Sequence, residues 1–158
     1  MKLYFLRHSD ALDGADDHSR PLSPRGRDEA EQLARFLNGS GVGFDTAYSS
    51  PLLRARQTAE IILQLCDAIP PDKLQLTDSL RNETPPAAFT RWLAQLPKGR
   101  HVLLVGHAPS LAARVRELLT ISDPNALQLP KAGLACVDSE DRAKGSLDFF
   151  ITPALLGD

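Results

Sequence analysis

The chain has 158 residues and a formal net charge of −2 at pH 7, and 42% of its residues are hydrophobic. This length suits one domain with a sizeable core, and we expect residues 1–158 to form a single domain. The balanced charge excludes the strongly basic classes of protein, so neither nucleic acid nor an anionic membrane is an expected partner.

Apolar runs in the sequence are short. None approaches the roughly 18 apolar residues of a membrane-spanning helix, and the run at the N terminus is too short for the core of a signal peptide. The two cysteines, Cys66 and Cys136, lie in apolar patterns without C-x-x-C spacing, which is typical of buried free thiols in a reducing compartment. These features predict a cytoplasmic enzyme or binding protein.

The first predicted element is a strand at residues 3–6, an apolar and aromatic run that leads directly into Arg7 and His8. Continuous apolar runs are typical of buried parallel strands, and ligands bind beyond the carboxyl ends of such strands. Arg7 and His8 are therefore expected on the rim of a sheet, within reach of a phosphate or carboxylate. A polar loop follows at residues 13–20 and ends in Arg20.

Two helices with the same start signal flank a short predicted strand at residues 45–48. A serine followed by proline marks each start, because the serine hydroxyl caps the first turn and proline suits the first helical position. The first helix is predicted at residues 24–39, and the second has Ser50 as its cap and reaches about residue 66. Arg54 lies in the first turn of the second helix, where the positive end of the helix dipole also favours an anion.

The second half of the chain continues the alternation of strands and helices. Residues 101–105 form the clearest strand, which ends in Gly106 and His107. The other predicted elements are an edge strand at residues 74–76, helices at residues 88–96 and 111–119, and a hairpin of strands at residues 134–137 and 146–152. This order predicts an α/β fold, a three-layer α/β/α sandwich around a mixed, mostly parallel sheet.

Four side chains are expected to converge on one rim of this sheet: Arg7, His8, Arg54 and His107. Two imidazoles and two guanidiniums make an anion-binding site that contains a candidate nucleophile. Arginine suits the binding of phosphoryl oxygens because its fork is always charged and bidentate. Neutral imidazole is nucleophilic near pH 7. A solvent-exposed helix charge is the simpler interpretation of a lone arginine, but the position of Arg54 after a strand end favours the site.

The same segments resemble those of the histidine phosphatase superfamily, the phosphoglycerate-mutase-like enzymes. Arg7 and His8 resemble its signature at the end of the first strand, and residues 50–58 (SPLLRARQT) resemble its S-P-x-x-R-A-x-Q-T segment. Residues 105–107 (VGH) resemble the segment that carries its second histidine. The opening R-H-S-D-A and residues 20–26 (RPLSPRG) are closer still to its small bacterial branch, the SixA-type phosphohistidine phosphatases.

The resemblance implies a phosphoglycerate-mutase-like fold and a role for each site residue. His8 is the implied nucleophile, and it forms a phosphohistidine that water then hydrolyses. Arg7, Arg54 and His107 hold the phosphoryl oxygens, with Arg20 as a further phosphate contact. Neither a metal nor another cofactor is required, because the arginines supply the charge that Mg²⁺ supplies in other phosphoryl-transfer sites.

Two positions match the family pattern less closely. Ser9 stands where much of the superfamily has glycine, but serine is small enough to fit. Glu83 lies about where the mutase branch places its proton donor, without that branch's surrounding motif, so a solvated loop carboxylate is an equal interpretation. An alkoxide leaves poorly without a proton donor, whereas imidazole leaves readily. A site without a clear acid therefore fits a phosphohistidine substrate.

We expect a phosphohistidine phosphatase that acts on a phosphorylated protein, such as a histidine phosphotransfer domain or a phosphocarrier. The segments between the motifs are short and leave little material for a lid over a small metabolite. One alternative is a small-molecule phosphomonoesterase of the same fold. Another is a phospho-binding module that uses the arginines and histidines without turnover. Mutase activity would need longer insertions to enclose its substrate.

Overall fold

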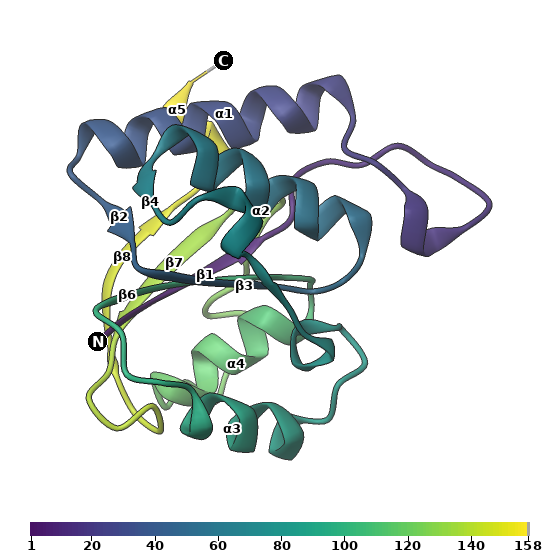
Figure 1. Cartoon of the computed structure of the whole chain (residues 1–158). Helices are drawn as coiled ribbons and strands as arrows, with labels where there is room; N and C mark the ends of the chain where they lie inside the picture. The colour runs from purple at the N-terminus through teal and green to yellow at the C-terminus, as the bar shows by residue number, and fades with distance from the viewer. Residues whose placement is uncertain (158) are drawn as a thin grey trace.

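The computed structural model describes residues 1–157, which build one six-stranded sheet covered by helices on both faces (Figure 1). Its strands lie in the order β5-β3-β6-β1-β7-β8. The first four are mutually parallel, whereas β7 and β8 are antiparallel to their neighbours. Their bounds are β1 (Lys2–Arg7), β3 (Thr46–Ser49), β5 (Gln75–Leu76), β6 (His101–Gly106), β7 (Leu134–Asp138) and β8 (Ser146–Ile151). The predicted mixed, mostly parallel sheet is confirmed.

The helices form the two outer layers of the sandwich. They are α1 (Pro24–Gly39), α2 (Leu53–Leu65), α3 (Pro86–Gln95), α4 (Ser110–Leu118) and the short α5 (Pro153–Leu156). Figure 1 shows α1, α2 and α5 over one face of the sheet and α3 and α4 over the other. No helix within residues 1–157 combines the length and the apolar character needed to cross a membrane.

The central strand β1 contributes to two separate cores because successive side chains of a strand point to opposite faces. Leu3 and Phe5 pack in the core beneath α3 and α4. Tyr4 and Leu6 pack in the core beneath α1 and α2. All four side chains are buried. A strand covered on both faces has no polar positions, which explains the continuous apolar run in the sequence.

The two predicted serine caps have different outcomes. Ser23 caps α1 as predicted, and its hydroxyl accepts a hydrogen bond of 3.0 Å from Gly26 N. The prediction for Ser50 was wrong, because α2 begins later and has no side-chain cap. The Ser50 hydroxyl instead accepts from Leu52 N at 3.2 Å and lies 2.8 Å from His107 Nε2. Ser50 therefore belongs to the site rather than to the helix.

Some elements had no signal in the sequence. A second sheet pairs β2 (Gly43–Phe44) with β4 (Asp67–Ala68), and three single 3₁₀ turns are η1 (Asp17–Ser19), η2 (Pro71–Lys73) and η3 (Asp78–Leu80). Strands of two residues are too short to show alternation. Both cysteines are free thiols, but only Cys136 is fully buried, whereas Cys66 is half-buried.

The start of α1 packs against the loop after β1 at Gly26. A Cβ atom at this position would lie 2.0 Å from the carbonyl oxygen of Asp10. The neighbouring Ser9 hydroxyl donates to Gly26 O at 2.7 Å. Because a methyl group must push α1 away from this loop, we expect Gly26→Ala to lower the free energy of unfolding by about 1–3 kcal/mol in urea denaturation.

The matched control for this substitution is Gly39→Ala at the other end of the same helix. No heavy atom lies within 4 Å of a Cβ at Gly39. We expect this variant to be neutral or more stable by up to about 1 kcal/mol, because alanine loses less backbone entropy than glycine in a helix. Equal stability of the two variants would contradict the close packing of α1 on the loop.

Candidate active site

The backbone brings three strand ends together at the carboxyl edge of the sheet. The pairing of β1 with β6 continues past Arg7, since His8 N donates to Gly106 O at 3.0 Å. On the other side of β6, Ser50 N donates to Val105 O at 3.0 Å. The segments that follow β1 and β3 therefore flank the segment that follows β6, which carries a second histidine.

His8 and His107 lie side by side in this edge, with their ring centroids 5.0 Å apart. They are only 8% and 3% exposed. His8 Nδ1 lies 2.7 Å from the carbonyl oxygen of Ser9. A carbonyl can only accept, so Nδ1 carries the proton and Nε2 keeps a free lone pair. The imidazole of His8 is thus held in one tautomer and in one orientation.

Both imidazoles are held in the neutral form. Burial lowers the pKa of His8 to about 3; its hydrogen bond to Ser9 opposes this effect, and the charges of His107, Arg54 and Arg7 add to it. Burial also lowers the pKa of His107 to about 4, with the positive charge of Arg54 as the next cause. At neutral pH each ring therefore has an unprotonated nitrogen.

Arg7 contributes a partly buried guanidinium to the same edge. Its Nη1 donates to Leu129 O at 3.0 Å, and burial lowers its pKa. Its Nε is buried and has no hydrogen-bond partner among residues 1–157. A buried donor without a partner costs about 1–3 kcal/mol, so an oxyanion that accepted from this nitrogen would relieve a real penalty.

Arg54 lies almost buried in the first turn of α2. Its Nη1 donates to the carbonyl oxygen of Asp17 at 2.8 Å, and its Nη2 lies 3.4 Å from the carboxylate of the same residue. Arg20 also binds Asp17, at 3.1 Å, and donates to Leu12 O at 2.8 Å. Arg20 therefore reaches the cluster through Asp17, and its direct contact with a phosphoryl group stays a prediction.

Asp17 is a site residue that the sequence did not reveal, because its loop reads as a solvated acidic segment. Its carboxylate accepts from Arg20, and this hydrogen bond is the main cause of its lowered pKa, with the charge of Arg54 as a smaller one. The two arginines thus hold a carboxylate of this chain between them. An anion is the natural partner of such a pair.

Gln57 and Thr58 of the S-P-x-x-R-A-x-Q-T segment tie α2 to the loop after β1. Gln57 accepts from Leu22 N at 2.8 Å. The Thr58 hydroxyl accepts from Ser9 N at 3.1 Å and donates to Arg54 O at 2.7 Å. These contacts fix the two ends of the segment that follows His8. The hydroxyl of Ser9 has a partner of its own, so the serine fits without an unsatisfied polar group.

Glu83 lies on the rim of the site and not within it. Its side chain is 73% exposed, and its carboxylate is 3.6 Å from Arg81. The charge of Arg81 is a minor cause of the lowered pKa of His107. Arg81 also lies 3.1 Å from Nε2 of His18, which comes from the loop after β1. The role of Glu83 as a proton donor stays a prediction, and Arg81 is a rim residue that sequence reasoning missed.

Within residues 1–157, His, Cys, Asp and Glu side chains do not gather in groups of three that could hold a metal ion. The donors that do gather are imidazoles and guanidiniums, which suit a tetrahedral oxyanion. The donors at the carboxyl edge of the sheet are therefore of the kind that suits the oxyanion of a phosphoryl-transfer reaction.

Comparison with known proteins identifies the family of the chain. The model of the histidine phosphatase superfamily (branch 1) matches residues 3–82, a segment that includes Arg7, His8 and Arg54. It spans half of the chain, and the chain belongs to this superfamily.

Individual relatives extend the match beyond that segment. An uncharacterized protein of Picosynechococcus sp. is 35% identical over 139 residues, which cover 85% of this chain and 82% of that protein. Phosphohistidine phosphatase SixA of Escherichia coli K12 is 28% identical to this chain, and the alignment covers 99% of this chain and 96% of SixA. A solved structure of the protein histidine phosphatase SixA with tungstate superimposes with a TM-score of 0.89, 28% identity and 99% of each chain covered.

The buried neutral histidines predict a specific loss of stability in acid. In the unfolded chain a histidine binds a proton as the pH falls below about 6.5, whereas the folded sites exclude it until about 3 and 4. Unfolding therefore takes up protons, and the free energy of unfolding must decrease as the pH falls through this window. Each histidine contributes up to about 1.4 kcal/mol per pH unit below pH 6.

Urea denaturation between pH 5 and 6.5 measures this slope, above the range in which carboxyl groups titrate. We expect His8→Asn and His107→Asn each to remove about half of the slope, and the double variant to remove both contributions. An unchanged slope in the double variant would mean that the folded protein protonates these histidines freely.

Proposed function

We propose that this chain is a phosphohistidine phosphatase, which removes phosphoryl groups from histidines of a protein through a covalent intermediate on His8. The observation that carries the proposal is the state of this residue. Its tautomer is fixed with a free lone pair on Nε2, and its pKa of about 3 keeps the ring neutral. A neutral imidazole fixed between guanidiniums is a nucleophile for an anionic phosphorus centre.

The proposed reaction has two steps. Nε2 of His8 attacks phosphorus in line, the bond between phosphorus and the substrate nitrogen breaks, and the leaving imidazole keeps the electron pair and takes up a proton. Water then attacks the phosphorus on His8, and inorganic phosphate and free His8 result. Arg7, Arg54 and His107 hold the equatorial oxygens in both steps, where charge develops. Arg54 must exchange part of its contact with Asp17 for phosphate.

The relatives support the proposal for the substrate. SixA of Escherichia coli is a phosphohistidine phosphatase, and the solved SixA structure holds tungstate, a tetrahedral oxyanion like phosphate. We propose a phosphorylated protein as the substrate, for example a histidine phosphotransfer domain or a phosphocarrier. A single domain is supported by one sheet that takes strands from the whole chain.

Metal independence and a cytoplasmic location belong to the same proposal. Arg7 and Arg54 supply the positive charge that Mg²⁺ supplies in other phosphoryl-transfer enzymes. The two free thiols are typical of proteins in a reducing compartment.

The position of the Glu83 carboxyl group, 3.6 Å from Arg81, favours a second candidate function, a small-molecule phosphomonoesterase of the same fold. This carboxyl group lies near the rim, where it could protonate an alkoxide leaving group. A phospho-binding module without turnover differs from both enzymes, since its histidine would stay unmodified.

A substrate panel in excess EDTA tests the proposed function. We expect turnover of a histidine-phosphorylated protein and of phosphoimidazole to exceed that of alkyl phosphate esters, because imidazole is the better leaving group. Acid-quenched enzyme should carry acid-labile labelled phosphate on His8. His8→Ala should lose turnover and label while it keeps the wild-type circular dichroism, since the side chain lies at the edge of the sheet and outside both cores.

Other outcomes would favour one of the alternative functions or contradict a part of the proposal. Preferred hydrolysis of alkyl esters would favour the phosphomonoesterase, and tight binding of phosphate without label would favour the binding module. A strict metal requirement would contradict the role of the arginines. Substantial turnover by His8→Ala would remove His8 as the nucleophile.

Glu83→Gln separates the two enzymes by their leaving groups. We expect this change to leave phosphohistidine hydrolysis within about twofold of wild type, because departure of imidazole needs little help from a carboxyl group. Hydrolysis of an alkyl phosphate should fall further, by about tenfold or more, because the alkoxide needs a proton. The measurement compares the hydrolysis rates of wild type and Glu83→Gln on a phosphohistidine substrate and on an alkyl phosphate. A large and equal loss on the two substrates would make Glu83 essential in another step, such as positioning water.

A further inference from the structure

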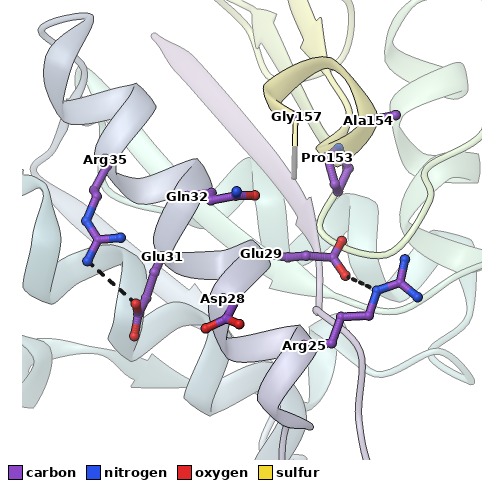
Figure 2. A pocket seen from close by; sticks show the side chains of 9 residues that line it. All are labelled: Arg25, Asp28, Glu29, Glu31, Gln32, Arg35, Pro153, Ala154 and Gly157. Atoms are coloured by element: carbon purple, nitrogen blue, oxygen red, sulfur yellow. Dashed lines mark hydrogen bonds and ion pairs between the residues drawn. The ribbon is translucent and has the colours of Figure 1, made fainter.

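A second feature of the surface begins beside the site and runs along α1. The outward face of α1 and the C-terminal segment line a hollow of about 680 Å³ (Figure 2). Figure 2 shows Glu29 and Gln32 pointing from α1 toward Pro153. The residues that line this hollow are Arg25, Asp28, Glu29, Glu31, Gln32, Arg35, Pro153, Ala154 and Gly157.

This hollow adjoins another one of about 540 Å³ that borders the site residue Arg7. The two hollows share four lining residues, Arg25, Glu29, Pro153 and Ala154. Together they form one open groove, which we name the α1 groove. It begins at Arg7 and ends at Arg35. The helix rises about 15 Å between Arg25 and Arg35, a length that four or five extended residues of a partner can span.

Most charges of the α1 groove are already paired within this chain. The three pairs, with their shortest distances, are Arg25–Glu29 at 3.1 Å, Arg35–Glu31 at 3.6 Å and Lys131–Asp10 at 2.7 Å. Paired groups have little to gain from an outside partner, so they leave the groove without a general preference for basic or acidic ligands.

Two polar side chains of the groove have no such partner. Neither Asp28 nor Gln32 makes a side-chain hydrogen bond or ion pair with another described residue, and Figure 2 shows both between the two ion pairs of α1. Asp28 offers a single free negative charge, about 4.5 Å along the helix from Arg25. Gln32 offers an amide, which can bind the backbone of an extended segment. The groove thus presents a positive charge at Arg7 and a free negative charge farther along.

We propose that the α1 groove docks the segment of a phosphorylated protein that flanks its phosphohistidine, with a lysine or arginine of that segment paired to Asp28. This proposal rests on the proposed function and names the substrate feature that the same site selects. A phosphohistidine on a protein cannot reach His8 without bringing its neighbours against the rim. The groove is the part of that rim that continues from Arg7, and its charges match an anion followed by a cation.

Synthetic phosphohistidine peptides test the charge pattern. One carries lysines three to five residues from the phosphohistidine on either side, and its counterpart carries glutamates; phosphoimidazole reports the chemistry without docking. We expect wild type to prefer the lysine peptide by about three- to fivefold in kcat/KM, the range of one partly exposed ion pair. Asp28→Lys should reverse the preference and leave turnover of phosphoimidazole unchanged.

Glu140→Lys is the matched control, with the same change in net charge. Glu140 is exposed in the turn between β7 and β8, at the end of the sheet opposite to Arg7. It should keep the wild-type preference, whereas an equal shift in both variants would show a general charge effect and overturn the proposal. Turnover of phosphoimidazole without a preference between the two peptides would also overturn the docking proposal. That result would leave the proposed function intact. If wild type hydrolyses no phosphohistidine compound, the proposed function fails and the docking proposal with it.

Discussion

The parallel pairing of β1 with β6 is the constraint on which the site depends. Their register runs from Lys2 opposite His101 to Arg7 opposite Gly106, and one further hydrogen bond continues it to His8. Each strand is followed directly by a histidine, so this register alone places the two imidazoles at the same height of the sheet. A slip of one residue would point them to opposite faces. The two packed cores that fix the register therefore also fix the position of His8.

Burial of these histidines links stability and chemistry. Two imidazoles beside two guanidiniums cannot both be charged at low cost, and the surrounding apolar sheet disfavours the charged form further. Their pKa values of about 3 and 4 are the result. The same burial that lowers these pKa values keeps lone pairs free at neutral pH. A site for phosphoryl transfer gains from this arrangement because its positive charge comes from arginine, which stays protonated.

The sequence predicted the elements whose signal is local and missed the contacts that join distant segments. The apolar run of β1 and the order of strands and helices were sufficient for the sheet, and the strand ends placed His8, Arg54 and His107 correctly at one edge. Asp17 and Arg81 reach the site from loops whose path no periodicity encodes. The serine-proline pair at Ser50 gave a false cap, because the competing contact with His107 becomes visible only when β3 and β6 pair.

Helix α1 connects the loop that carries His8 to the surface beyond the site. Its inward side packs at Gly26 against the loop that carries His8, so closely that a methyl group has no room. Its outward side carries Asp28 and Gln32 in the α1 groove, less than two turns farther along. A helix is stiff over this distance, so a partner docked on the outward side is held at a fixed position relative to His8. Precise placement of the reacting atoms is a large part of catalysis, and here one helix can supply it for a substrate bound mainly outside the site.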